Sequence, residues 1–419
     1  MPLGAFARRA STALASARPS TSRAFTALSA GNGDFGRLGH GQVLTDDDVS
    51  FRSSNYFHPV RGLEDVDVTQ CAAGGAHSIF LAHGGFVFAC GLNNYGQLGH
   101  GKHSAHVPEA ALVDLDVEVV RVAAGNNHTL CVDVDGGVWA FGKNEGGQLG
   151  TGLDLDGFQP RRIETLGLEG KIVDVACGAE HSLALSEDGR VYSWGTSADG
   201  VLGHGSETWN EGWFYRTAKT VAKPRLLRAL SETKVRSIAA GHMHSACVDE
   251  RGELFTWGQG RFNQLGQTSK YVDHETAPKS VDTLRFVHQV TCGGLHTLAS
   301  TSAGVVSWGA NQHGELGHGS NSDAKSAIPK PIKLSSRGWS KLSAGWKHSA
   351  GVSNDGKLFA WGFGGSVGSH SDEKLSSGGQ LGLGNDFDYW EPTEVWLPGD
   401  AVGVSCGFNH TLALVRLGA

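Results

Sequence analysis

The chain has 419 residues, 61 of them glycine, and a formal net charge of −7. No apolar run reaches the roughly eighteen residues of a membrane-spanning helix, so we expect no insertion into a membrane. The acidic balance disfavours wholesale wrapping of nucleic acid, which depends on many phosphate contacts, and no basic tail suggests chromatin binding.

The first 24 residues differ in composition from the rest of the chain. They contain Arg8, Arg9, Arg18 and Arg23, many Ser, Thr and Ala, and no acidic residue. On a helical wheel the apolar residues of the first half gather on one face, away from Arg8 and Arg9. This pattern predicts a mitochondrial presequence over residues 1–24 and a location in the mitochondrial matrix. An arginine-containing tail without a targeting role is the alternative.

From residue 25 onward, a unit of roughly fifty to sixty residues recurs along the chain. In its clearest copy, Val290–Gly319, short apolar runs alternate with small polar residues and glycines, which is strand periodicity and not helical periodicity. Each copy has a G-x-x-H-[ST] signature. Its histidines are His77, His128, His181, His244, His296, His348 and His410. One such meander cannot bury both its faces, so we expect the copies to pack together as one domain, residues 25–419.

A second signature, L-G-x-G, closes most copies. It stands at Leu98–Gly101, Leu149–Gly152, Leu202–Gly205, Leu316–Gly319 and Leu381–Gly384, with a degenerate copy at Leu265–Gln267. The remaining copy, Leu38–Gly41, precedes the first histidine, whereas His410 has none after it. One repeat is therefore divided between the two ends of the chain. We expect the N-terminal strand to complete the blade begun by Val402–Val415 and to close the row of blades into a ring.

A W-G pair accompanies the two signatures in four copies. The pairs begin at Trp194, Trp257, Trp308 and Trp361. This combination resembles the regulator of chromosome condensation repeat family over about 25–419, and the resemblance implies an all-β, seven-bladed propeller. Cys90, Phe141 and Ala30 stand where the Trp is expected, so the packing of those blades is in doubt.

The Pro-bearing strand between each L-G-x-G and the next G-x-x-H differs in charge along the chain. In the middle copies it is basic, at Pro160–Arg162, Lys223–Arg225, Pro278–Lys279 and Lys330–Lys333. In the first and last copies it is acidic or mixed, at Pro108–Glu109 and Glu391–Glu394. Equivalent strands should lie at equivalent places on the ring, so we expect one arc of the rim to be positive. An ordinary mixture of surface charge is the alternative.

The longest interruption of the repeat is residues 206–234, where aromatic residues are followed by Lys and Arg. We expect its partner-binding residues to be Trp209, Trp213, Phe214, Tyr215, Arg216, Lys219, Lys223 and Arg225. Rings beside cations suit a protein hot spot or the stacking of unpaired bases. Packing of these rings against the propeller is the alternative. A second insertion, Gly364–Gly379, is rich in Gly and Ser and reads as a mobile loop.

No motif predicts a metal, a cofactor or a catalytic site. The ring should hold the seven signature histidines apart, and none has a second ligand three to five residues away, so we expect structural hydrogen bonds. The seven cysteines form no C-x-x-C pair and resemble small buried residues. No nucleophile is joined to a base. If a signature glycine such as Gly293 holds a strained conformation, its replacement by Val should cost about 1–3 kcal/mol, whereas a silent replacement would mean that the glycine only saves space.

Two functions remain. The first is a non-enzymatic mitochondrial interaction scaffold for a large protein or ribonucleoprotein assembly, ribosomal or RNA-processing, with RNA contact through residues 206–234. A structural accessory subunit of another mitochondrial complex is a variant of it. The second, implied by the family resemblance, is guanine nucleotide exchange on a small GTPase. In that activity loops of one propeller face displace the nucleotide, and no residue of this chain can be assigned to it.

Overall fold

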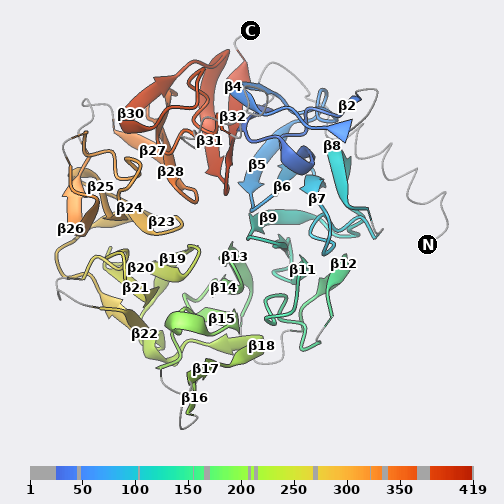
Figure 1. The fold of residues 1–419 in the computed structure, drawn as a ribbon. Helices are drawn as coiled ribbons and strands as arrows, with labels where there is room; N and C mark the ends of the chain where they lie inside the picture. Colours follow the sequence, from blue (N-terminus) through green and yellow to red (C-terminus); the bar gives the residue numbers. More distant parts are fainter. Residues whose placement is uncertain are drawn as a thin grey trace.

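A computed structural model of the chain describes residues 25–44, 49–101, 104–153, 155–164, 170–205, 209–211, 216–267, 272–320, 322–332, 338–365 and 378–417. Seven four-stranded antiparallel sheets form a ring around a common axis (Figure 1). The predicted all-β fold, a seven-bladed propeller, is confirmed. The described ranges contain no α-helix, and the 3-10 segments that lie wholly within them are η1 (Asp34–Gly36), η2 (Ala198–Gly200) and η4 (Arg228–Leu230).

Each blade has four strands, which we count from the axis outward. Blade 1 consists of β5 (Val68–Ala73), β6 (His77–Ala82), β7 (Val87–Leu92) and β8 (His106–Leu112). Blade 2 consists of β9 (Val119–Ala124), β10 (His128–Asp133), β11 (Val138–Gly142) and β12 (Gly157–Arg162). Blade 3 consists of β13 (Ile172–Cys177), β14 (His181–Ser186), β15 (Val191–Thr196) and β18 (Thr220–Leu226). Blade 4 consists of β19 (Val235–Ala240), β20 (His244–Asp249), β21 (Leu254–Gln259) and β22 (His274–Ser280). Blade 5 consists of β23 (Val287–Cys292), β24 (His296–Thr301), β25 (Gly304–Ala310) and β26 (Lys325–Pro331). Blade 6 consists of β27 (Trp339–Ala344), β28 (His348–Ser353), β29 (Leu358–Gly362) and β30 (Tyr389–Val395). Blade 7 consists of β31 (Gly399–Cys406), β32 (His410–Leu417), β1 (Phe25–Gly31) and β4 (Ser54–Pro59). Two short hairpins lie outside the blades, β2 (Val43–Leu44) with β3 (Val49–Ser50) and β16 (Trp209–Glu211) with β17 (Arg216–Ala218).

Blade 7 joins the two ends of the chain, as the order of the signatures predicts. Strand β1 pairs antiparallel with β32 over its whole length, from Phe25 opposite Arg416 to Gly31 opposite His410. On its other side β1 pairs with β4. The predicted closure is confirmed, and β1 is paired with a neighbouring strand on both of its edges.

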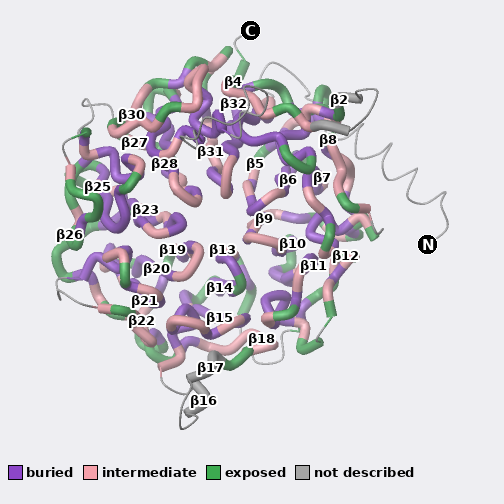
Figure 2. The backbone as a smooth tube through the Cα atoms, viewed as in Figure 1, coloured by how far each residue is buried: buried purple, intermediate pink, exposed green. Residues whose placement is uncertain are grey.

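The second strand of each blade forms the centre of the core. Every residue of β6, β10, β14, β20 and β28 is buried. Figure 2 shows the buried residues in the middle of the blades and the exposed ones mainly toward the rim. The apolar clusters lie between neighbouring blades, and one of them packs Leu130 and Val132 of blade 2 against Trp194 of blade 3. Sheet alternation thus gives each blade two buried faces, one against each neighbour.

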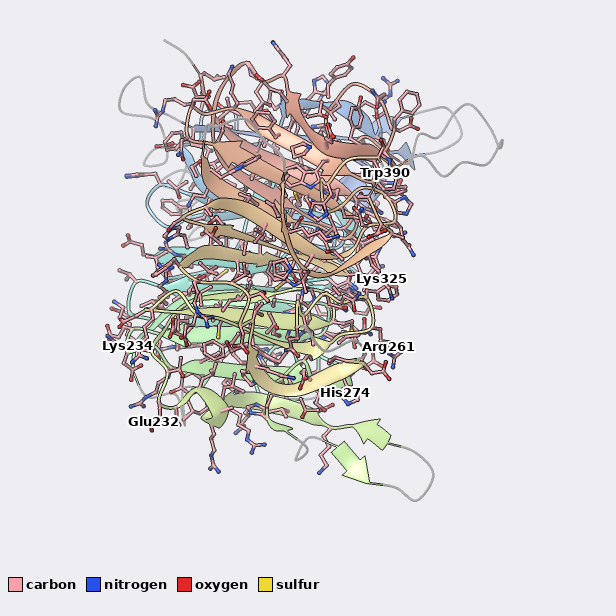
Figure 3. The ribbon with its side chains drawn as sticks, turned by 90° about the vertical axis from the view of Figure 1, so that its left-hand side faces the viewer. Glu232, Lys234, Arg261, His274, Lys325 and Trp390 are labelled. Atoms are coloured by element: carbon pink, nitrogen blue, oxygen red, sulfur yellow. The ribbon has the colours of Figure 1, made fainter. Side chains whose placement is uncertain are left out.

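The two faces of the ring carry different connections. The turns between first and second strands and the loops between third and fourth strands lie on one face, which we call the signature face because it holds both signatures. The turns between second and third strands and the links between blades lie on the opposite face. In Figure 3 Arg261, His274, Lys325 and Trp390 lie toward the signature face, and Glu232 and Lys234 lie toward the opposite face.

The insertion at residues 206–234 is shorter than the sequence suggests. Its second half contains β18, the regular fourth strand of blade 3, and the 3-10 segment η4. Only the part before Thr220 departs from the repeat, and there β16 and β17 form a hairpin that projects beyond the blades on the signature face (Figures 1 and 3). The two parts of the predicted insertion therefore lie in different structural contexts.

Two predictions concern residues at or beyond the limits of the described chain. The presequence-like segment 1–24 lies outside the described residues, as does most of the second insertion, residues 366–377. Among the helices that the structure describes, none has the length and the apolar composition of a membrane span.

Candidate functional site

The seven signature histidines form a closed ring of hydrogen bonds that joins each blade to the next. In each contact the imidazole Nε2 lies 2.9–3.1 Å from the hydroxyl oxygen of the Ser or Thr that follows the histidine of the neighbouring blade. The contacts join His77 to Thr129, His128 to Ser182, His181 to Ser245, His244 to Thr297, His296 to Ser349, His348 to Thr411 and His410 to Ser78. The last contact links blade 7 to blade 1, so the ring has no gap. The prediction that these histidines make structural hydrogen bonds is confirmed.

The hydroxyl groups determine which nitrogen of each imidazole carries the proton. Ser349, for example, donates its hydroxyl proton to the carbonyl oxygen of Glu315 at 2.8 Å, so its oxygen must accept from His296 Nε2–H. The same donation to the residue before the Leu of L-G-x-G occurs in all seven blades, at 2.6–2.9 Å. Burial lowers the pKa of His296 to about 3, so this imidazole is neutral at physiological pH.

The signature glycines provide the space in which these imidazoles lie. A Cβ added to Gly293 would lie 2.7 Å from the carbonyl oxygen of Gly345 and closer still to Cε1 of His296. The same clash with the blade's own histidine recurs at Gly74, Gly125, Gly178, Gly241, Gly345 and Gly407. Gly293 has no positive φ. The condition of a strained backbone is therefore not met at Gly293, and lack of space, not conformation, requires a glycine there.

The tryptophans of the W-G pairs support the same carbonyl groups. Trp361 Nε1 donates to Glu315 O at 2.9 Å, beside the hydroxyl of Ser349. Equivalent bonds of 2.8–2.9 Å come from Trp194, Trp257 and Trp308. Where the sequence lacks Trp, Cys90 places its sulfur 3.7 Å from Arg37 O, and Phe141 is fully buried without a donor. The predicted equivalence of these positions is confirmed by their pairing with the residue after the signature histidine.

The residue after each signature glycine lies at the mouth of the central channel, and here the seven copies differ. The channel mouth on the signature face encloses about 120 Å³ and is lined by all seven signature turns. In blades 1, 2, 3 and 5 the residue is small or polar, as Gly75, Asn126, Ala179 and Gly294. In blades 4, 6 and 7 it carries a ring, as His242, Trp346 and Phe408.

The three rings touch one another in a row, which we call the aromatic row. Trp346 and Phe408 are stacked, with centroids 4.4 Å apart and planes at 13°. Trp346 also meets His242 edge-on, at 4.2 Å and 75°, although blade 5 lies between their blades. Gly294 of blade 5 permits this, since a Cβ there would lie 2.8 Å from Cε3 of Trp346. The row covers one side of the channel mouth, and Gly75, Asn126 and Ala179 leave the other side open.

Charged side chains flank the aromatic row. Lys347, next to Trp346, lies over the ring of Phe363, with Nζ 5.5 Å from its centroid. His313 contacts the same ring at 4.6 Å, and its Nδ1 lies 2.9 Å from Asp388 Oδ2. Glu315 occupies the position of a glutamine in several other blades, and burial raises the pKa of its carboxyl group. The departures from the repeat thus gather on the signature face of blades 4 to 7.

Across the open side of the channel mouth lies a second charged group. Lys143 Nζ is 3.0 Å from both Glu145 and Glu180. Burial lowers the pKa of His242, and the nearby Glu180 opposes this shift. The mouth is therefore bordered on one side by the ion pairs of Lys143 and on the other by Lys347 and the hydrogen-bonded His313 and Asp388.

The structure separates the residues predicted to bind a partner. Trp209 and Arg216 lie on the backbone of the β16–β17 hairpin, whereas Trp213, Phe214 and Tyr215 lie outside the described residues. Lys219 precedes β18, and Lys223 and Arg225 lie on β18 itself, at the rim. The aromatic row was missed because Trp346, Phe408 and His242 are far apart in sequence. The available signal was the variation of one position within an otherwise constant turn.

The predicted placement of the Pro-bearing strands is confirmed, since each is the fourth, outermost strand of its blade. Among the described residues no group of three or more His, Cys, Asp and Glu lies together in a way that could hold a metal ion. All seven cysteines are free, and five of them are buried. Burial raises the pKa of the Cys71, Cys90 and Cys406 thiols to about 12, so these groups are unreactive.

Comparison with sequence families and curated proteins identifies relatives over most of the chain. The family model described as RCC1-like domain matches residues 26–413. The ultraviolet-B receptor UVR8 of Arabidopsis thaliana is 33% identical over 82% of this chain and 74% of that protein. The human E3 ubiquitin-protein ligase HERC2 is 32% identical over 84% of this chain, but the match spans only 7% of that protein. The similarity to HERC2 therefore concerns one part of a much longer protein.

Solved structures agree with the fold. Human WBSCR16 superposes with a TM-score of 0.79 at 26% identity, covering 95% of this chain and all of that chain (100%). Prp20p of Saccharomyces cerevisiae, a structure described with its binding properties to Gsp1p and histones, superposes with a TM-score of 0.78 at 22% identity, covering 98% of this chain and 95% of that chain. The similarity to Prp20p shows the fold alone.

Proposed function

Because the chain belongs to the RCC1-like domain family, we propose that it is a non-enzymatic interaction module and that a protein partner docks on its signature face. The observation that carries this proposal is the aromatic row at the channel mouth. The histidine ring is the same in every blade and accounts for the fold. The row departs from the repeat and is only partly buried.

The chemistry of the channel mouth suits a protein contact. Protein interfaces are anchored by a few aromatic or Arg side chains in partly enclosed pockets, with polar groups around them. Here Trp346 and Phe408 supply rigid stacked rings, the open side of the mouth supplies a shallow pocket, and Lys347 and Glu180 stand at its edge. A partner side chain inserted beside Asn126 would be enclosed by the edge of the row.

The identity of the assembly is a finer part of the proposal and rests on sequence. The composition of residues 1–24 supports a mitochondrial location, and the cations around the 206–234 segment support a ribosomal or RNA-processing partner. The β16–β17 hairpin projects on the same face as the aromatic row, so one partner can contact both. An accessory role in another mitochondrial complex would use the same surface.

Sedimentation of a mitochondrial lysate at low salt tests this proposal. The chain with Trp346→Ala and Phe408→Ala should sediment as a free protein, whereas the unchanged chain should comigrate with a large particle. Trp396→Ala is the matched control, because Trp396 is a 78% exposed indole in a link on the opposite face. Treatment with RNase then tells whether the particle is a ribonucleoprotein. Equal sedimentation of the unchanged chain and the double variant would contradict docking at the row.

Guanine nucleotide exchange is the alternative that the same face could serve, since it requires loops that displace a nucleotide and no catalytic side chain. Prp20p is described by its binding to Gsp1p, but no residue correspondence supports a transfer of that property. Release of labelled GDP from a panel of mitochondrial small GTPases measures it directly. Accelerated release that Trp346→Ala abolishes would make exchange the function of the channel mouth. If GDP release is not accelerated for any GTPase of the panel, the interaction module is the one proposed function that remains.

A further inference from the structure

The outer rim carries a pattern of charge that has no part in the docking proposed for the signature face. In blades 2 to 6 the fourth strand has a Pro at the end of the same bulge, and the next residue resumes pairing with the third strand. In four successive blades, 2 to 5, that next residue is a cation. The four cations, which we call the basic arc, are Arg161 opposite Ala140, Arg225 opposite Ser193, Lys279 opposite Thr256 and Lys330 opposite Ser307.

The other blades have no cation at this position. Their residues are Ala111 in blade 1, Thr393 in blade 6 and His58 in blade 7. The residue before the first strand of a blade does not follow this division, since it is Lys171 in blade 3 and Lys234 in blade 4 but Glu118 in blade 2. The cation after the bulge Pro is therefore the feature that distinguishes blades 2 to 5.

Three members of the basic arc are exposed to a ligand, and the fourth, Arg225, is partly exposed. Arg161, Lys279 and Lys330 are exposed, as are the neighbouring Arg162 and Lys325. Lys279 lies 2.9 Å from Glu275 and Lys330 lies 3.9 Å from Asp323, but both lysines remain about half exposed, at 51% and 47%. Exposed pairs of this kind are weak and are readily exchanged for another anion.

We propose that the basic arc binds the phosphate backbone of a single-stranded nucleic acid that follows the rim across blades 2 to 5. Each blade presents one cation at the same height, so a flexible chain of regularly spaced phosphates can meet all four. The contacts are to phosphate, and they position a strand without reading its sequence. This site is on the rim and is independent of the channel mouth.

The geometry argues against other polyanions. An acidic peptide that adds a strand to the sheet edge is obstructed, because the bulge and Pro160, Pro224, Pro278 and Pro329 interrupt the outer strands. A folded protein would require apolar anchors, and among the fourth-strand residues of blades 2 to 5 that the structure describes only Ile328 is a large exposed apolar one. A flat membrane cannot meet four strands that turn with the ring, and duplex DNA, with a persistence length of about 150 base pairs, is too stiff to follow them.

Fluorescence anisotropy with the purified full chain tests the site. The probes are a labelled oligouridylate and a labelled oligothymidylate of about 30 nucleotides. The test variant combines Arg161→Gln, Arg225→Gln, Lys279→Gln and Lys330→Gln. The control variant removes the same number of exposed cations outside the arc, with Arg61→Gln, Arg121→Gln, Lys341→Gln and Lys357→Gln. Circular dichroism melting confirms that both variants are folded.

Both probes should bind the unchanged chain with similar affinity, because the contacts are to phosphate. The test variant should bind more than about tenfold more weakly, and its slope of log K against log salt should be smaller by about 3, as expected for four lost single-strand contacts. The control variant should lose less than about threefold. Equal losses in the two variants, absence of binding by the unchanged chain, tighter binding of a duplex, or equal displacement by polyglutamate would each overturn the proposal.

Discussion

The residues of the inner histidine ring and of the channel mouth are two positions apart in each signature turn, yet they differ completely in regularity. At the ring, every blade has the same histidine, the same hydroxyl partner and the same glycine. At the mouth, three blades have aromatic or imidazole rings and the others have small or polar residues. In a molecule of repeats, positions that all blades share explain the fold. Positions at which neighbouring blades differ, and at which the differences cluster in space, indicate the partner.

The largest expected effect of this difference is acid sensitivity of the ring. Burial lowers the pKa of His77, His128, His181, His244, His296 and His348 to about 3 and that of His410 well below 6.5. Between about pH 6.5 and pH 3 the unfolded chain therefore binds more protons than the folded one, and stability falls as the pH falls. Well below pH 6.5 each histidine contributes about 1.4 kcal/mol per pH unit to this loss, so seven together contribute about 10 kcal/mol per pH unit.

We therefore predict a steep, single unfolding transition between about pH 6 and pH 4, with uptake of close to seven protons by the imidazoles. Circular dichroism follows the transition, and NMR of the imidazole resonances counts the histidines that protonate with it. A gradual transition, or protonation of the ring while the chain remains folded, would contradict the neutral buried ring.

The second prediction compares two tryptophans of the same blade. Trp361 is fully buried and donates to Glu315 O, so Trp361→Ala should cost about 4 kcal/mol of unfolding free energy. Trp346 lies in the aromatic row and is half-buried, so Trp346→Ala should cost only about 1 kcal/mol. Urea unfolding followed by circular dichroism measures both. Similar losses would mean that the row is part of the core and would weaken its assignment to a partner.

The third prediction separates space from conformation at glycine. Gly293→Ala should cost about 3 kcal/mol, because its Cβ has no room beside His296 and Gly345. The control is Gly205→Ala, where φ is +74° but no atom lies within 4 Å of the added Cβ. That variant should lose only about 1 kcal/mol of unfolding free energy, the cost of holding an alanine backbone at a positive φ. Chemical denaturation ranks the two. The reverse order would mean that the turn relaxes to admit a Cβ at Gly293, so that lack of space does not require the glycine.

The smallest effect is expected where the repeat lacks its tryptophan. In blade 2 Phe141 replaces Trp, so Gln97 O accepts from Thr129 without a second donor from this position. Phe141→Trp should restore the indole bond and raise the unfolding free energy by about 1 kcal/mol. Thermal unfolding measures the change, and Phe141→Leu serves as the control that adds no donor. A loss with Trp as large as that with Leu would mean that blade 2 has adapted its packing to the smaller ring.

The sequence predicts the fold well because the repeat places each signature at a fixed distance along the strands. The closure by β1 follows from the position of Leu38–Gly41 before the first histidine, and the outer position of the Pro-bearing strands follows from equivalence. The candidate site was less predictable. Trp346 meets His242 only because Gly294 in the intervening blade has no side chain, and this contact depends on how the ring curves. Composition alone drew attention to residues 206–234, yet Lys223 and Arg225 belong to a regular strand.

Site-specific photocrosslinking in cells tests the central claim most directly, because it compares the two faces of one intact protein. A photoreactive amino acid would be placed at Asn126, on the open side of the channel mouth, or at Trp396, on the opposite face. The account predicts one dominant protein adduct from position 126, lost when Phe408→Ala is added, and none from position 396. An adduct only from position 396, or equal adducts from both, would contradict docking at the signature face.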